Sequence, residues 1–135
     1  MMCLDTNAII AAINNRPARV RDRLTRALAD GERVGVPVIA LFELVYGYEK
    51  SQQRHANRAA AQSFMTLDVE PLAFEPADAE HAGAIRALLE RAGTPIGHYD
   101  LLIAAQARRY DATLVTANRR EFARVPDLKV VDWGA

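Results

Sequence analysis

Three acidic side chains stand within or directly beside apolar runs of this chain. Asp5 directly follows the first apolar run, and Glu43 is the only charged residue in an otherwise apolar stretch from residue 38 to 46. Asp100 immediately precedes a third apolar run. Two carboxylates about 5 Å apart repel by roughly 3 kcal/mol at an effective dielectric near 20. A cluster of all three therefore requires protons or a divalent cation.

The chemistry of such a cluster follows from its ligands. Carboxylate oxygens select Mg²⁺ or Mn²⁺ over zinc, and the single Cys3 leaves no thiolate set for a zinc site. A bound hard cation orients and activates water and stabilises charge on a phosphate under attack. An acidic site of this kind favours phosphodiester hydrolysis.

Each acidic residue also has a simpler explanation. Asp5 suits the position that caps a following helix, and Asp100 in a first helical turn complements the helix dipole. The same dipole is expected to keep Asp100 ionised and able to bind metal. Glu43 fits the polar stripe of an exposed helix, although a helix apolar on nearly every side is expected to be mostly buried. Asn118, after the apolar run that ends at Thr116, is also a common turn residue.

Alternating short apolar runs and longer helical segments must position these side chains. Strands are expected near residues 1–4, 34–36, 67–72, 113–116 and 128–131, and helices near 8–13, 17–30, 38–48, 52–65, 75–91 and 98–109. Strands that alternate with helices over short connections predict a parallel sheet covered on both faces. Ligands bind such sheets at the carboxyl ends of the strands, where Asp5 and Asn118 are expected.

Composition bounds the function. The 135 residues are expected to form one domain, residues 1–135. The chain carries 17 basic and 17 acidic residues, so no global field draws it to nucleic acid, and any RNA binding requires a local patch. No apolar run approaches the roughly 20 residues that span a bilayer, and no basic segment precedes an apolar one at the N-terminus. A cytoplasmic protein without a membrane partner is expected.

Arginines supply two candidate patches. Arg16, Arg19, Arg23 and Arg26 recur at helical spacing. This face is either a solvated helix surface, an RNA backbone track or a contact with a partner protein. Arg119 and Arg120 lie beside the expected site and are better phosphate ligands. His98 stands near Asp100, but a loop role is favoured over that of a catalytic base.

Four segments together resemble the PIN domain, and more narrowly the VapC toxins of type II toxin–antitoxin modules. They are Leu4–Asn7, Leu41–Gly47, Ile96–Ala105 and Leu114–Phe122. The resemblance extends over essentially the whole chain. It implies a three-layer α/β/α sandwich with a central, mainly parallel sheet. It also implies a Mg²⁺-dependent endoribonuclease, with Mn²⁺ as a possible substitute, that cuts tRNA or rRNA and so inhibits translation.

The same resemblance assigns site residues and partners. Asp5 and Asp100 match direct metal ligands, Glu43 matches a third acid that acts on the metal directly or through water, and Thr6 matches the hydroxyl beside the first aspartate. Asn118 stands where the family has a fourth acid. An amide offers only a carbonyl oxygen, so the number of metal ions is open, and Glu121 is placed to reach the same pocket. The expected partners are RNA, a VapB-type antitoxin in a hetero-oligomer and a second copy in a homodimer.

Other classes fit the residues less well. A haloacid-dehalogenase-type phosphatase needs a second aspartate two residues after the first, where this chain has Asn7. A receiver domain needs an early acidic pair, and Asp5 stands alone. A non-catalytic interaction module on the PIN fold remains the alternative. Such a module is expected to have lost one of its three main acids, and this chain retains all three.

Overall fold

Five short parallel strands form the centre of the molecule, in the order β3-β2-β1-β4-β5. The computed structural model describes residues 1–135, and the strands are β1 (Met2–Leu4), β2 (Val34–Pro37), β3 (Glu70–Leu72), β4 (Thr113–Val115) and β5 (Lys129–Val131). β2 is buried along its whole length, and Cys3 and Leu4 of the central strand β1 are buried as well, as a covered parallel sheet requires.

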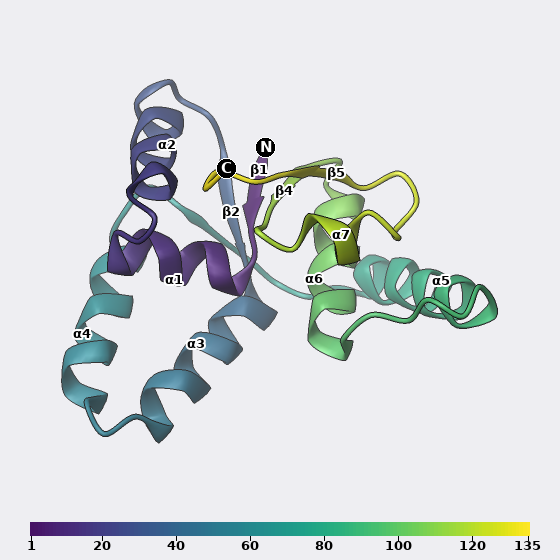
Figure 1. The fold of residues 1–135 in the computed structure, drawn as a ribbon, viewed down its shortest axis with the longest axis horizontal. Coiled ribbons are helices and arrows are strands. Elements are labelled where there is room, and N and C mark those ends of the chain that lie inside the picture. The colour runs from purple at the N-terminus through teal and green to yellow at the C-terminus, as the bar shows by residue number, and fades with distance from the viewer.

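Helices cover the two faces of this sheet, which confirms the predicted α/β/α sandwich (Figure 1). They are α1 (Thr6–Asn14), α2 (Ala18–Ala29), α3 (Val38–Lys50), α4 (Arg54–Met65), α5 (Pro76–Arg91), α6 (His98–Arg109) and α7 (Arg119–Phe122). In the view of Figure 1, α1 to α4 lie to the left of the sheet, and α5 and α6 lie to the right. No helix is long and apolar enough to span a membrane.

The predicted elements differ from the structure at two places. The strand expected at residues 67–72 is only Glu70–Leu72. The reason is that the amides of Thr66 and Leu67 still bond to the last turn of α4, at Ser63 and Phe64. The short helix α7, which follows Asn118, was not predicted. It belongs to a polar stretch without an apolar period, so its sequence carries no clear helical signal.

The expectation that the helix carrying Glu43 is mostly buried is wrong. Only Ala40 and Leu44 of α3 are buried, whereas Val38, Phe42 and Tyr46 are exposed on its surface. The helix projects beyond the end of the sheet in Figure 1, so most of its surface has no layer to pack against. Its apolar character therefore does not report burial within this chain, and an exposed apolar face of this size is typical of an interaction surface.

The order of the strands creates a crevice. From β1 the chain moves outward to β2 and β3 in one direction, then crosses back to β4 on the other side of β1. The connections from β1 and β4 therefore leave the sheet toward opposite faces and open a space at its carboxyl edge. Asp5 follows β1 and Asn118 comes shortly after β4, so both lie beside this switch point.

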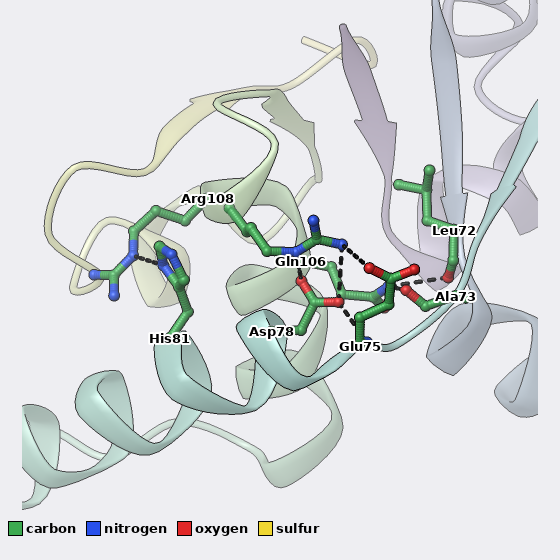
Figure 2. A network of polar contacts seen from close by, with 8 residues as sticks. Leu72, Ala73, Glu75, Asp78, His81, Gln106 and Arg108 are labelled. Atoms are coloured by element: carbon green, nitrogen blue, oxygen red, sulfur yellow. Dashed lines mark hydrogen bonds and ion pairs between the residues drawn. The ribbon is translucent and has the colours of Figure 1, made fainter.

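A polar network fastens α5 and α6 to the sheet (Figure 2). Asp78 of α5 is fully buried, and its carboxylate accepts hydrogen bonds from the Arg109 guanidinium and from the Glu75 amide. Gln106 donates to the carbonyls of Leu72 (2.9 Å) and Ala73 (3.1 Å), just where β3 ends. The network sets the position of α6, whose first turn carries Asp100.

Gly35 lies where β2 and β3 approach closely, and this contact predicts a specific sensitivity. A Cβ at Gly35 would lie 2.7 Å from Leu72 Cδ1, inside the buried core. Gly35→Ala should therefore destabilise the protein by about 1–3 kcal/mol, because overpacked cores force side chains out of their rotamers. Gly83→Ala is the control, since Gly83 sits in α5 with open space around it. There the change should stabilise the helix by about 0.5–1 kcal/mol. Urea unfolding of both variants measures the two signs.

Candidate active site

Asp5 is the most deeply placed acid of the site. It caps α1, because its Oδ1 accepts a hydrogen bond of 2.8 Å from the Ala8 amide. The capping role therefore coexists with the functional one. Burial raises the pKa of the Asp5 carboxyl above its ordinary value, and the charges of Glu43 and Asp132 raise it further. Hydrogen bonds from the Thr116 hydroxyl and the Ala8 amide oppose this shift.

Thr6 and Glu43 join α1 to α3. The Thr6 hydroxyl donates a 2.6 Å hydrogen bond to Glu43 Oε1 across two helices. The contact aims the Glu43 side chain toward the start of α1, where Asp5 lies. Because Glu43 also acts electrostatically on Asp5 and Asp100, its carboxylate belongs to the same cluster rather than to a solvent-facing stripe.

The pKa of Asp100 contradicts one expectation from the sequence. The helix dipole was expected to keep it ionised, but its pKa is raised to about 6 by burial and by the charges of Glu121, Glu43 and Asp5. A hydrogen bond with Glu121 also favours the protonated form of the carboxyl. The dipole of one helix is outweighed because it is worth at most about 1 kcal/mol at a partly exposed site, whereas several carboxylates converge here.

Glu121 is held in the site by contacts distant in sequence. Its Oε1 accepts from the Gly97 amide at 3.0 Å, and its Oε2 accepts from Asn118 Nδ2 at 2.6 Å. The absence of a side chain at Gly97 leaves room for these carboxylates, because a Cβ at this position would lie 3.4 Å from Asp100 Oδ2. Asn118 therefore orients Glu121 through its amide, and Glu121 supplies the fourth acidic group beside Asp100.

One further acid was missed by the sequence reasoning. Asp132 follows β5 and lies close enough to raise the pKa of Asp5. It occupies the same kind of position as Asp5, directly after a strand of the sheet, so the rule that found Asp5 had the signal to find it. Its Oδ1 accepts a 2.8 Å hydrogen bond from the Gly134 amide, which turns it toward the end of the chain.

The remaining candidates lie at the margin. His98 is exposed and makes no polar contact with the acids. Arg119 and Arg120 are exposed at the start of α7, next to Asn118. The arginines of α2 lie outside the acidic cluster, on the surface of that helix.

The donor set fits a hard divalent cation. No three acidic side chains are already gathered around one coordinating point, since Glu43 and Glu121 are each turned toward hydrogen-bond donors. However, burial and, after it, the charges of neighbouring carboxylates raise the pKa values of Asp5 and Asp100. A divalent cation relieves the repulsion between these charges, and every group offered to it is an oxygen ligand.

Known proteins provide an independent comparison. Residues 2–128 match the model of the PIN domain. The chain is 42% identical to the tRNA(fMet)-specific endonuclease VapC of Shigella flexneri, over 96% of both chains. Among solved structures it resembles VapBC2 of Rickettsia felis bound to a promoter DNA fragment, with a TM-score of 0.91 and 34% identity, covering 98% of each chain. It also resembles DNA-bound VapBC of Salmonella typhimurium, with a TM-score of 0.89 and 39% identity over 98% of this chain and 97% of that one.

Proposed function

This chain belongs to the PIN domain family and is a ribonuclease of the VapC type, and on that premise we propose that it uses Mg²⁺ at Asp5, Glu43 and Asp100 to cut tRNA. The observation that carries this proposal is the convergence of acids from four separate segments at the switch point of the sheet. PIN nucleases are in general metal-dependent, and the choice of Mg²⁺ rests on the oxygen donors alone.

The residues have distinct parts in the proposed reaction. Asp5 and Asp100 would hold the ion directly, while Glu43, steadied by the Thr6 hydroxyl, would hold it directly or through a water molecule. When bound, the ion supplies the positive charge that activates water and neutralises the phosphate under attack. Because the pKa of Asp100 is raised to about 6, protons compete with the ion at this carboxylate below about pH 6. Arg119 and Arg120 are placed to contact the phosphates beside the cut.

The retained acids argue against a non-catalytic module. Asp5 is buried and its pKa is raised, and the pKa of Asp100 is raised as well. The charged cluster therefore lowers the stability of the folded protein in the absence of a ligand. A protein that only bound other proteins would gain by replacing either carboxylate with an amide. Their retention favours the nuclease.

A nuclease of this kind requires an inhibitor, and we propose a VapB-type antitoxin. A groove of about 200 Å³ between α1, α3 and α4 reaches Glu43 and is otherwise lined mainly by apolar side chains such as Ile10 and Leu44. An apolar antitoxin segment would fill it and direct a basic side chain at the carboxylates. Folding of a disordered segment on binding carries an ordering cost. RNA and antitoxin would meet the enzyme in the cytoplasm.

A second copy of the chain is the proposed occupant of another surface. Phe42 of α3 and Tyr99 of α6 form an exposed edge-to-face pair with ring centroids 5.3 Å apart. Val38 and Tyr46 extend this apolar face along α3. We propose that it is the homodimer contact.

The function is tested by sequencing RNA ends after brief expression of the wild type and of Asp5→Ala. The wild type should arrest growth and create new ends within tRNA, and Asp5→Ala should do neither, because it removes the most buried ligand. Co-expression of the proposed VapB-type antitoxin should restore growth. If new ends appear only in rRNA, the substrate is rRNA and not tRNA. Normal growth with abundant wild-type protein and no partner would favour the non-catalytic module.

The fourth acidic position can be tested separately. Because both oxygens of Glu121 already lie in the site, Glu121→Gln should weaken Mn²⁺ binding clearly. Asn118→Asp should bring only a small gain, since the new charge also faces Glu121 and removes its amide donor. Calorimetric titration with Mn²⁺ measures both. If neither change alters the affinity or the cleavage rate, these two residues do not belong to the metal site.

A further inference from the structure

Arginines of α2, together with Arg16 just before it, form a surface that the acidic site does not explain. Arg16, Arg19, Arg23 and Arg26 are all exposed and take part in none of the ion pairs or side-chain hydrogen bonds of the structure. Three other exposed or half-exposed arginines, Arg33, Arg54 and Arg86, each pair with a glutamate. These four side chains are called the α2 arginine track below.

One side of α2 packs on the rest of the molecule, and the track lies on its exposed side, where Asp22 is exposed as well. Val20 and Leu24 are buried against the core. Arg21 donates to the carbonyls of Ala12 and Ile13 at the end of α1. The track lies on the exposed side, where Arg23 and Arg26 line a shallow cavity of about 270 Å³ together with Trp133 and the acidic Asp30 and Glu32.

The near end of the track adjoins the acidic site. Pro17, which caps α2, lines a small cavity of about 50 Å³ shared with Asn7, Thr116 and Asp132. Thr116 and Asp132 both act directly on Asp5. From Arg19 to Arg26 the helix rises by about 10 Å, the length of roughly three phosphates at about 3.4 Å per residue of a stacked strand.

The charges make an RNA strand the fitting occupant. The chain has no net charge, and its site concentrates carboxylates that repel a polyanion. Arginine forks match phosphate oxygens, and phosphate contacts supply most of the affinity for nucleic acid. We propose that the α2 arginine track binds the RNA backbone beyond the cleaved phosphate, so that it holds the substrate against the repulsion of the site. This inference deepens the proposed ribonuclease function and rests on it.

Binding measurements test the track. A fluorescent tRNA transcript is titrated in EDTA, which prevents metal-dependent cleavage, at several salt concentrations. Each phosphate contact contributes about 0.7 to the slope of log affinity against log salt for single strands. The variant Arg19→Gln/Arg23→Gln should therefore lower the slope by about 1.4. Arg86→Gln/Arg91→Gln on α5 is the matched control, because it removes the same charge from the far side of the sheet (Figure 1) and should leave the slope unchanged.

Length of the probe gives a second control. With a trinucleotide, which fills only the site, cleavage by the α2 variant should equal that of the wild type. With tRNA, KM should rise about tenfold with kcat nearly unchanged. If the α2 variant keeps the salt slope and the KM of an active wild-type protein, the track does not bind RNA. If the variant loses only antitoxin binding, the track is a protein contact instead. Failure of the ribonuclease proposal appears differently, as wild-type protein that cuts neither probe in Mg²⁺.

Discussion

Asp100→Asn is expected to abolish most RNA cleavage while making the protein more stable in EDTA. The change removes a full ligand charge, and a loss of at least about 100-fold in metal affinity and rate should follow, since even the loss of a group that only orients a metal ligand costs about 10–100-fold. Asp5→Asn should act in the same direction. The gain in stability arises because the carboxylate at position 100 is partly buried and is repelled by Glu121, Glu43 and Asp5.

The pH dependence has a definite sign. The pKa of Asp100 is raised to about 6 in the folded protein, from an ordinary value of 3.8. The folded state therefore binds the proton more tightly than the unfolded state, and through this group stability falls as pH rises from about 4 to about 6. After allowance for the half-exposed side chain, Asp100→Asn should gain about 1–2 kcal/mol at pH 7.5 and little at pH 4.

Thermal unfolding in EDTA at both pH values, with Mn²⁺ titration, measures these effects. Asp68→Asn is the control, because Asp68 is exposed in the turn before β3 and should change neither quantity. Unaltered Mn²⁺ affinity in Asp100→Asn would remove Asp100 from the metal ligands. Equal stability of wild type and variant at pH 7.5 would contradict the crowding of carboxylates.

The second large effect is expected away from the site, at the ion pair between α5 and α6. Arg109→Met should lower the free energy of unfolding by about 3 kcal/mol, because it leaves the Asp78 carboxylate buried without its cation. That value is at the low end of the usual range, since the Arg109 side chain retains 19% exposure. Asp78→Asn in the same chain should recover part of the loss by removing the unpaired charge.

Arg86→Met provides the comparison on α5, the helix that carries Asp78. Arg86 pairs with Glu90 on an exposed face of α5, and such pairs contribute no more than about 0.5 kcal/mol. Urea unfolding of the three variants gives both values. A loss at Arg109 as small as that at Arg86 would show that Asp78 is satisfied by the Glu75 amide alone.

The sequence by itself determined the elements that rest on local patterns. The helix from His98 to Arg109 was predicted at both ends, because a breaker-rich loop precedes it and a charged turn follows an unbroken apolar run. The helix over residues 17–30 and its buried Val20 and Leu24 follow from their spacing in the same way. The parallel sheet follows from the alternation of such elements, and the resemblance of four segments identified the family before any contact was known.

Only the tertiary structure decided what depends on residues far apart in the chain. The amide of Gly97 and the side chain of Asn118 turn Glu121 toward Asp100, and no local pattern encodes that meeting. Asp132 joins the cluster because β5 pairs beside β4. The apolar face of α3 is exposed because no layer covers it, which its hydrophobic sequence could not reveal. Local patterns set which way a segment folds, whereas the charge state and exposure of its side chains are set by the neighbours that packing brings to them.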